Sequence, residues 1–128
     1  MRIQLRMSYE AQVLIAEKKI EALKLGDTIT SGQVIDTLAS KFKNCYQQIS
    51  WLYVKDEEEY ADVLSKYKKI NPTTLNLTDE TVKFLSDFVE YLNNELGMNR
   101  TVYRSFALRM LLKASKLEET GKTIQTHN

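Results

Sequence analysis

The fold is decided by one short stretch near the N-terminus, which reads Arg2-Ile3-Gln4-Leu5-Arg6-Met7-Ser8. Polar and apolar side chains alternate along it, which is the pattern of a β-strand with one buried face. Ser8 is a residue type favoured at the N-cap of a helix, and a helical pattern follows it. A lone strand leaves its backbone groups without partners, and even an isolated two-stranded ribbon is marginal in water. We therefore expect the chain to supply a second strand, and helices that cover the pair.

Two helical patterns follow this strand. The first runs from Tyr9 to Leu25 and ends at Gly26, a residue that commonly terminates helices. The second opens at Thr30, whose spacing to Gln33 is that of a capping box. We expect the apolar stripes of the two helices to face the core; they consist of Val13, Ala16, Ile20 and Leu23, and of Val34, Leu38 and Phe42. Residues 1–43 are thus predicted to form one strand-helix-helix unit.

The same order of elements returns in residues 73–117. Residues 73–77 alternate, Thr78 is a second candidate N-cap, and a helical stripe leads to Gly97. A last helix is expected over 100–116, with Asn99 as its N-cap. The strand end and the terminating Gly are 19 residues apart in the first unit and 20 in the second. The sequence therefore predicts an internal repeat of pattern.

Residues 44–72 form an insert between the two units, and residues 118–128 follow the second unit. The insert carries acids from Asp56 onward and lysines up to Lys69, a polarity that suits the dipole of a helix. We expect a helix over 56–69. Residues 118–128 are expected to be a frayed polar tail.

The composition is that of an ordinary globular protein and excludes several classes of function. The chain has 128 residues, is 43% hydrophobic and has a formal net charge of +1. One Cys and one His cannot make a zinc site or a nucleophile–base pair, so we expect no enzyme activity, no cofactor and no metal. Neither a signal peptide nor a long apolar run is visible, which favours a soluble cytoplasmic protein without a membrane partner.

Charge is unevenly distributed along the chain. From Leu96 to Leu117 there are five cations and no acid, and local patches matter more for binding than the net charge. The cations Arg109, Lys113 and Lys116 are equally compatible with a nucleic-acid surface and with a solvated helix face. In the insert, Trp51 and Tyr53 could stack on bases, but packing against the helices is the favoured interpretation.

The outward face of the predicted ribbon carries residues suited to DNA bases, namely Arg2, Gln4, Arg6, Thr74 and Asn76. Arg can give two hydrogen bonds to guanine, Asn or Gln can do the same with adenine, and Thr can contact thymine. A passive solvent face would be expected to carry Lys and Glu instead. A two-stranded ribbon also fits the major groove, which is about 12 Å wide. We therefore predict that these five residues read bases in double-stranded DNA.

On these residues the chain resembles two tandem ribbon-helix-helix units, the fold of the Arc/MetJ class of repressors. The resemblance rests on residues 2–8, on Thr74-Leu75-Asn76-Leu77-Thr78-Asp79-Glu80-Thr81-Val82 and on Gly97-Met98-Asn99-Arg100-Thr101. It implies a mainly α-helical protein with a small antiparallel two-stranded ribbon, arranged as a pseudo-dimer within one chain. Relaxosome accessory proteins of the TraY type are relatives with two units in one polypeptide. The insert, and Gly32 in the first turn of the second helix, depart from the common pattern.

The resemblance also implies phosphate contacts at the N-termini of the second helices, where free N–H groups and the helix dipole attract an anion. Thr30 and Ser31 would make them in the first unit, and Asn99, Arg100 and Thr101 in the second. The expected function is sequence-specific DNA binding, with repression of a promoter as the role and further self-association on DNA. The alternatives are a plasmid-transfer or partition accessory protein, and a helical, antitoxin-like protein-interaction module.

Overall fold

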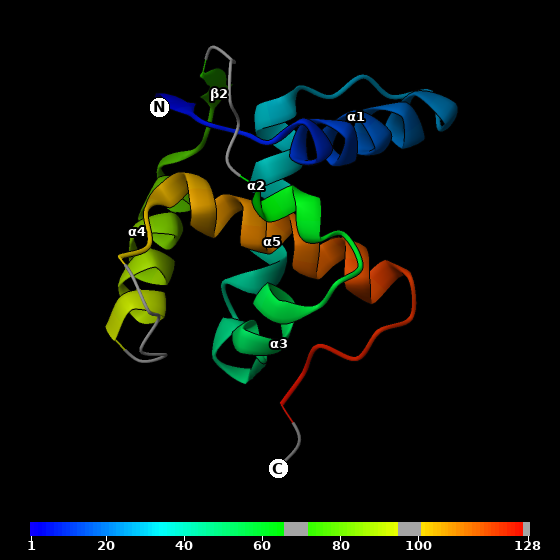
Figure 1. Ribbon diagram of the computed structural model, residues 1–128. Coiled ribbons are helices and arrows are strands. Elements are labelled where there is room, and N and C mark those ends of the chain that lie inside the picture. Colours follow the sequence, from blue (N-terminus) through cyan, green and yellow to red (C-terminus); the bar gives the residue numbers. More distant parts are fainter. Residues whose placement is uncertain (66–71, 95–100, 127–128) are drawn as a thin grey trace.

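The computed structural model describes residues 1–65, 72–94 and 101–126. Within these ranges the protein is mainly α-helical with one small antiparallel sheet, as the sequence predicts (Figure 1). The elements in chain order are β1 (Arg2–Leu5), α1 (Tyr9–Lys24), α2 (Ser31–Phe42), the 3-10 turn η1 (Tyr46–Gln48), α3 (Trp51–Asp56), the 3-10 turn η2 (Ala61–Leu64), β2 (Thr73–Asn76), α4 (Asp79–Asn94) and α5 (Arg104–Glu119).

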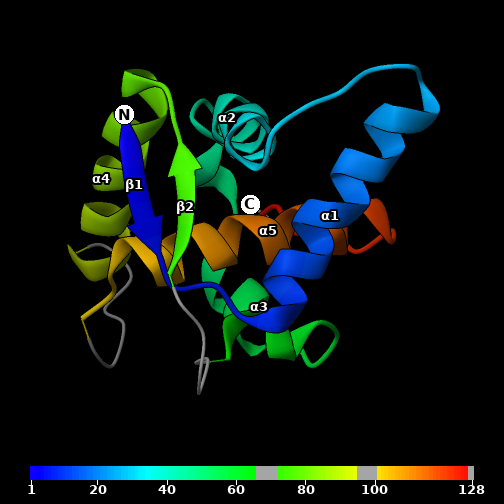
Figure 2. The ribbon, with the colours of Figure 1, turned by 90° about the horizontal axis from the view of Figure 1, so that it is seen from above.

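The two predicted strands pair with each other and form a ribbon. β1 and β2 run antiparallel, with Gln4 opposite Thr74. Beyond the strands, Leu77 N donates to Met1 O at 2.9 Å and the N-terminal ammonium donates to Leu77 O at 2.5 Å. Figure 2 looks down on this ribbon, with α5 crossing behind it. The inward-facing side chains are all buried: Ile3, Leu5, Met7, Leu75 and Leu77.

The expected N-caps of α1, α2 and α4 all form. The hydroxyl of Ser8 accepts the backbone N–H three residues further on at 3.1 Å, and the hydroxyl of Thr78 does the same at 3.2 Å. Thr30 and Gln33 form the reciprocal capping box at the start of α2. Each cap satisfies an N–H group that the helix itself leaves unpaired, so these residues fix where the three helices begin.

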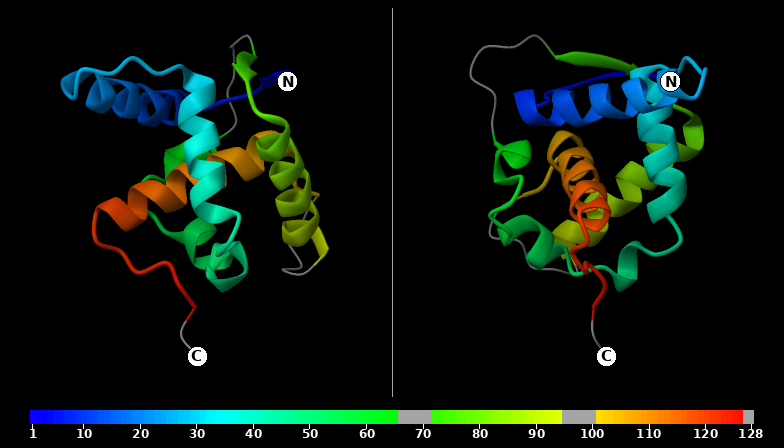
Figure 3. Two further views of the ribbon diagram at one scale, coloured as in Figure 1. Left: turned by 180° about the vertical axis from the view of Figure 1, so that it is seen from behind. Right: turned by 90° about the vertical axis from the view of Figure 1, so that its right-hand side faces the viewer.

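Helix α5 is the central element of the fold. Every residue from 107 to 115 is buried, and α5 contacts α1, α2, α3, α4 and η2. Figure 3 shows these elements arranged around it. A helix buried on all sides is ordinarily apolar all round. This one includes two cations, Arg109 and Lys113, whose side chains reach backbone carbonyl groups of the insert.

Aromatic side chains hold the insert against the helices. Trp51 is 1% exposed, and its ring centroid lies 5.9 Å from that of Phe42 and 4.6 Å from that of Phe88. Its Nε1 donates to the backbone oxygen of Tyr46 at 2.7 Å. Packing was the favoured interpretation of Trp51 and is confirmed, because a side chain buried in this way cannot stack on bases.

The predicted helix over 56–69 is wrong within the described residues. α3 ends at Asp56, the chain turns through Tyr60 in the left-handed region (φ 61°), and η2 follows. The ammonium group of Lys113 donates to backbone oxygens at the end of α3 and just beyond it, including Glu57 O at 2.6 Å. A cation at the carbonyl end of a helix stabilises that end, so α3 stops where the acidic run begins.

The predicted frayed tail over 118–128 is also wrong. Helix α5 extends into it, and Ile124 beyond the helix is fully buried. Ser50 N donates to Ile124 O at 2.8 Å, and Thr126 N donates to Gln48 O at 2.8 Å. These bonds and one apolar side chain fasten the segment to the insert, although its composition is polar. The last two residues lie outside the described part of the chain.

Helix α1 turns a different face to the core than predicted. Its buried residues are Ala11, Leu14 and Ile15. The stripe expected to be buried is exposed instead: Val13, Ala16, Ile20 and Leu23. The helix is apolar on two sides and only one of them can face the core. The hydroxyl of Ser8 donates to Val63 O at 2.6 Å, which fastens the first turn of α1 to η2 and helps to fix this rotation.

Gly32→Ala should destabilise the protein, although replacing Gly by Ala in a helix normally stabilises it by about 1 kcal/mol. A Cβ at position 32 would lie 2.0 Å from the backbone oxygen of Asn76, so α2 and β2 would have to separate. We expect the free energy of unfolding, measured by urea denaturation, to fall by roughly 1–3 kcal/mol. Ser40→Ala, at an exposed position of the same helix, is the control and should be neutral or slightly stabilising. A Gly32→Ala protein as stable as the wild type would contradict the close approach.

Candidate nucleic-acid interface

The ribbon presents polar side chains to solvent. Arg2, Gln4, Arg6, Thr74 and Asn76 are all exposed. The register places Arg2 opposite Asn76 and Gln4 opposite Thr74, so these four residues share one face of the sheet. Arg6 follows β1 and keeps the same alternation. The residues predicted to read bases are therefore brought together, and their donors and acceptors match those of base edges in the major groove.

The buried face of the ribbon determines which side chains point outward. Ile3 and Leu75 lie opposite each other and are 6% and 1% exposed. A slip of the register by one residue would turn such apolar side chains to water and the polar ones inward. The polar set is therefore held in one arrangement by the packing of the apolar set.

The N-terminus of α2 lies beside β2. Gly32 approaches the backbone of Asn76 so closely that no side chain fits between them, which explains the unusual glycine. Thr30 and Ser31, the predicted phosphate contacts of the first unit, therefore lie at the edge of the ribbon. Thr30 Oγ1 accepts the N–H of Gln33 at 3.1 Å and keeps its own proton for donation. The first N–H groups of a helix have no partner within the helix and favour an anion.

The corresponding turn of the predicted second unit lies only partly within the described residues. Two of its predicted phosphate contacts lie outside the described residues, Asn99 and Arg100. Thr101 is exposed, but α5 begins at Arg104, later than predicted. The side chain of Asn93 accepts from Val102 N at 2.6 Å and donates to Val102 O at 3.0 Å. This pair of bonds holds the backbone before α5 in a non-helical conformation.

Three cations of the basic stretch interact with other groups of the protein. The guanidinium of Arg109 is buried and donates to Ser65 O at 2.6 Å. Lys113 is fully buried, and burial lowers its pKa because the ammonium group loses hydration. Lys116 Nζ lies 3.1 Å from a carboxylate oxygen of Glu17. Arg109 and Lys113 therefore belong neither to a nucleic-acid surface nor to a solvated helix face. They fasten the insert to α5.

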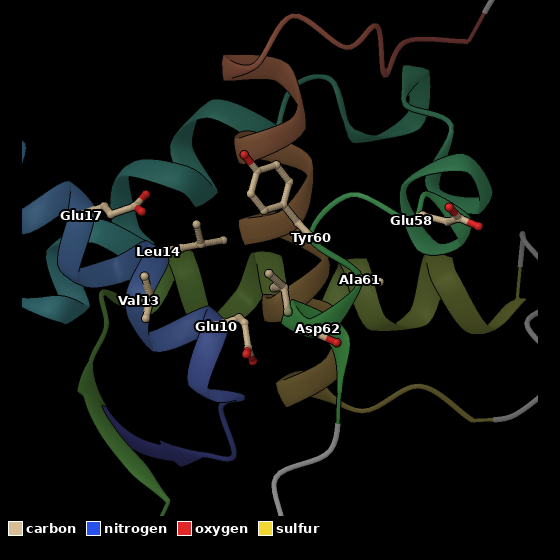
Figure 4. Close-up of a pocket in the computed structure, with 9 residues that line it drawn as sticks. Glu10, Val13, Leu14, Glu17, Glu58, Tyr60, Ala61 and Asp62 are labelled. Carbon is tan, nitrogen blue, oxygen red and sulfur yellow. The ribbon is translucent and has the colours of Figure 1, made fainter.

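A cavity between α1 and η2 is lined by acidic side chains. This cavity of about 420 Å³ is lined in part by Glu10, Glu17 and Asp62. Figure 4 shows these carboxylates on both sides of the cavity, together with Tyr60. Carboxylates repel phosphate, so this side of the molecule is unsuited to DNA. Among the described residues, no group of three or more His, Cys, Asp and Glu side chains is placed to hold a metal ion.

Comparisons with known proteins identify no family for this chain. No model of a protein family matches the chain. Comparison with curated proteins gives no significant match, and comparison with solved structures gives none either. A search of the described residues for a helix long and apolar enough to cross a bilayer finds none.

Lys113→Met should remove a pH dependence of stability. Burial holds the pKa of Lys113 below its ordinary value of 10.5, so the unfolded chain binds this proton more tightly than the folded one. The wild-type free energy of unfolding therefore contains a contribution that rises with pH between the lowered pKa and 10.5. The difference in unfolding free energy between wild type and variant, measured in urea from about pH 7 to 10, should show this rise.

The control for this measurement is Lys122→Met. Glu59 raises the pKa of Lys122, so its contribution to stability is constant below the ordinary pKa and is lost only above it. The corresponding difference should stay level over the same range. A level difference for Lys113→Met as well would contradict the buried charge.

Proposed function

We propose that this protein binds double-stranded DNA sequence-specifically by placing the β1–β2 ribbon in the major groove. The observation that carries the proposal is the difference between the two faces of the ribbon. The inward side chains are buried, and the outward ones are Arg, Gln, Thr and Asn at adjacent cross-strand positions. These side chain types make the commonest specific contacts to bases. A ribbon covered by helices on one face can enter the groove only with the other, which is the polar face.

The symmetry of the ribbon supports a tandem ribbon-helix-helix arrangement. Adding 70 to the bounds of α1, Tyr9–Lys24, gives the bounds of α4, Asp79–Asn94. With the same offset Gln4 corresponds to Thr74, and these two residues lie opposite each other in the ribbon. The pairing is therefore symmetric about that pair. Two copies of one unit related by a two-fold axis would pair in the same way, so a pseudo-dimer within one chain accounts for the register.

Contacts to phosphate would position the ribbon, and contacts to bases would supply specificity. The N-terminus of α2 offers Thr30 and Ser31 beside β2 for the first purpose. Arg2 and Arg6 add positive charge on the ribbon itself. Because the net charge of the chain is only +1, long-range attraction to DNA is modest. Specific contacts on the ribbon must therefore supply much of the affinity.

As its role we propose repression of a promoter by occupation of a short operator. The two strands carry different residues on the outward face, so one chain would prefer a non-palindromic site. A plasmid-transfer or partition accessory protein would use the same interface at a different place on the DNA. A helical interaction module would not bind DNA at all.

Selection of bound duplexes from a random pool tests the proposal. We expect a short asymmetric consensus, together with weak binding to random duplex whose affinity falls steeply with salt. The folded chain should be confirmed by circular dichroism in the same buffer. Failure of the folded chain to bind any duplex at low salt would reject DNA binding and leave the interaction module.

Arg6→Ala should weaken binding to the selected site by about 1–3 kcal/mol and relax the preference at one base pair. The loss follows from removing a bidentate donor, and competition binding at fixed salt measures it. Lys122→Ala is the control, because it removes a positive charge from the segment after α5, which lies away from the ribbon in Figure 1. It should leave specific affinity nearly unchanged. Equal affinities for wild type and Arg6→Ala would contradict base reading by the segment of β1.

A further inference from the structure

The exposed side of α1 carries a continuous apolar stripe, which we call the α1 seam. It consists of Tyr9, Val13, Ala16, Ile20 and Leu23, and Leu25 continues it just beyond the helix. Exposed fractions are 61% for Tyr9, 51% for Ile20 and 60% for Leu23. The members are spaced alternately four and three residues apart. That is the a/d spacing of helices that pair along their length.

The α1 seam is distinct from the ordinary apolar content of a protein surface. Single exposed apolar residues are common and need no explanation. In the described part of the chain, large exposed hydrophobic side chains away from α1 and Leu25 are scattered: Met1, Leu52 and Tyr103. On α1 they form one row. Figures 1 and 3 show α1 along one side of the molecule, with its far end extending from the rest of the fold.

We propose that the α1 seam binds the α1 seam of a second copy of this chain, with the two helices antiparallel. A two-fold axis between the copies would place Val13 opposite Leu23 and Ala16 opposite Ile20, and each of these contacts would occur twice. A two-fold interface uses the same patch on both partners. A row with a/d spacing fits this requirement, because its alternating spacing is the same when the helix is read in the opposite direction.

Charges beside the α1 seam favour the antiparallel orientation. Glu10 lies in the first turn of α1 and Lys24 in the last, so an antiparallel pair brings each Glu10 beside the Lys24 of the other copy. A parallel pair would instead bring Lys19 towards Lys24, which are like charges. The antiparallel axis also brings Glu17 and Lys19, near the centre of the helix, towards the same residues of the other copy, but Glu17 is already compensated by Lys116 at 3.1 Å. The dipoles of two antiparallel helices attract each other and also favour this orientation.

The size of the α1 seam sets the expected strength of the dimer. One helix face from each copy covers an area at or below the low end of the roughly 1,200–2,000 Å² that specific interfaces bury. A dissociation constant in the range of about 10–100 μM is therefore expected, corresponding to about 5–7 kcal/mol. This association needs no DNA and does not depend on the function proposed above.

Sedimentation equilibrium of the full chain without DNA, from about 5 to 500 μM, tests the proposal. We expect a reversible monomer–dimer equilibrium, and Leu23→Glu should raise the dissociation constant at least tenfold, or about 1.4 kcal/mol. Leu52→Glu is the matched control, because Leu52 is 47% exposed on α3, outside the α1 seam, and the dissociation constant should not change. A monomer at every concentration overturns the proposal, and so does a dimer that Leu23→Glu leaves intact.

Charge reversal provides a second test that preserves the apolar row. Lys24→Glu should weaken the dimer, because it places two carboxylates side by side, and adding Glu10→Lys should restore it. Circular dichroism of each variant separates this effect from a change in the stability of α1. If the double variant does not regain the affinity lost by Lys24→Glu, the antiparallel pairing is wrong.

Discussion

The pairing of β1 with β2 is the constraint on which the rest of the structure depends. The two strands are separated by almost 70 residues of sequence, and neither has another partner in the described sheet. Their hydrogen bonds bring Ile3 and Leu75 together as part of the buried core. The same bonds set the order of polar groups on the other face. Stability and the proposed recognition therefore rest on one set of backbone contacts, and a change that shifts the register disturbs both.

The described part of the insert, residues 44–65, belongs to the core. Arg109 and Lys113 are charged residues of a buried helix, and burying a charge without partners is costly. Backbone oxygens of the insert supply those partners, with Ser65 O accepting from Arg109 and Glu57 O from Lys113. Trp51 adds an apolar anchor between α2 and α4. The fold is therefore more compact than a pair of units joined by a linker, and the segment after α5 packs on the same insert through Ile124.

Local signals in the sequence predicted the elements that depend on local chemistry. Strand alternation and the capping residues Ser8, Thr30 and Thr78 are contained within a few positions, and all are confirmed. The outward ribbon residues follow from the same period of two. The rotation of α1 could not be predicted, because both of its sides are apolar. The end of α3 depends on Lys113, which is distant in sequence. The start of α5 depends on the hydrogen bonds between Asn93 and Val102, and no residue near Arg100 in the sequence indicates them.

Because β1 and β2 are different segments of one chain, each outward position of the ribbon is encoded once. In a ribbon built from two identical chains, every substitution appears twice and must be tolerated on both strands. Here Gln4 can be replaced while Thr74 opposite it stays the same. Mutation can therefore alter one edge of this outward surface at a time, and the apolar face that both strands share need not change. If the surface reads DNA as we propose, the chain can acquire a new recognition sequence in single steps.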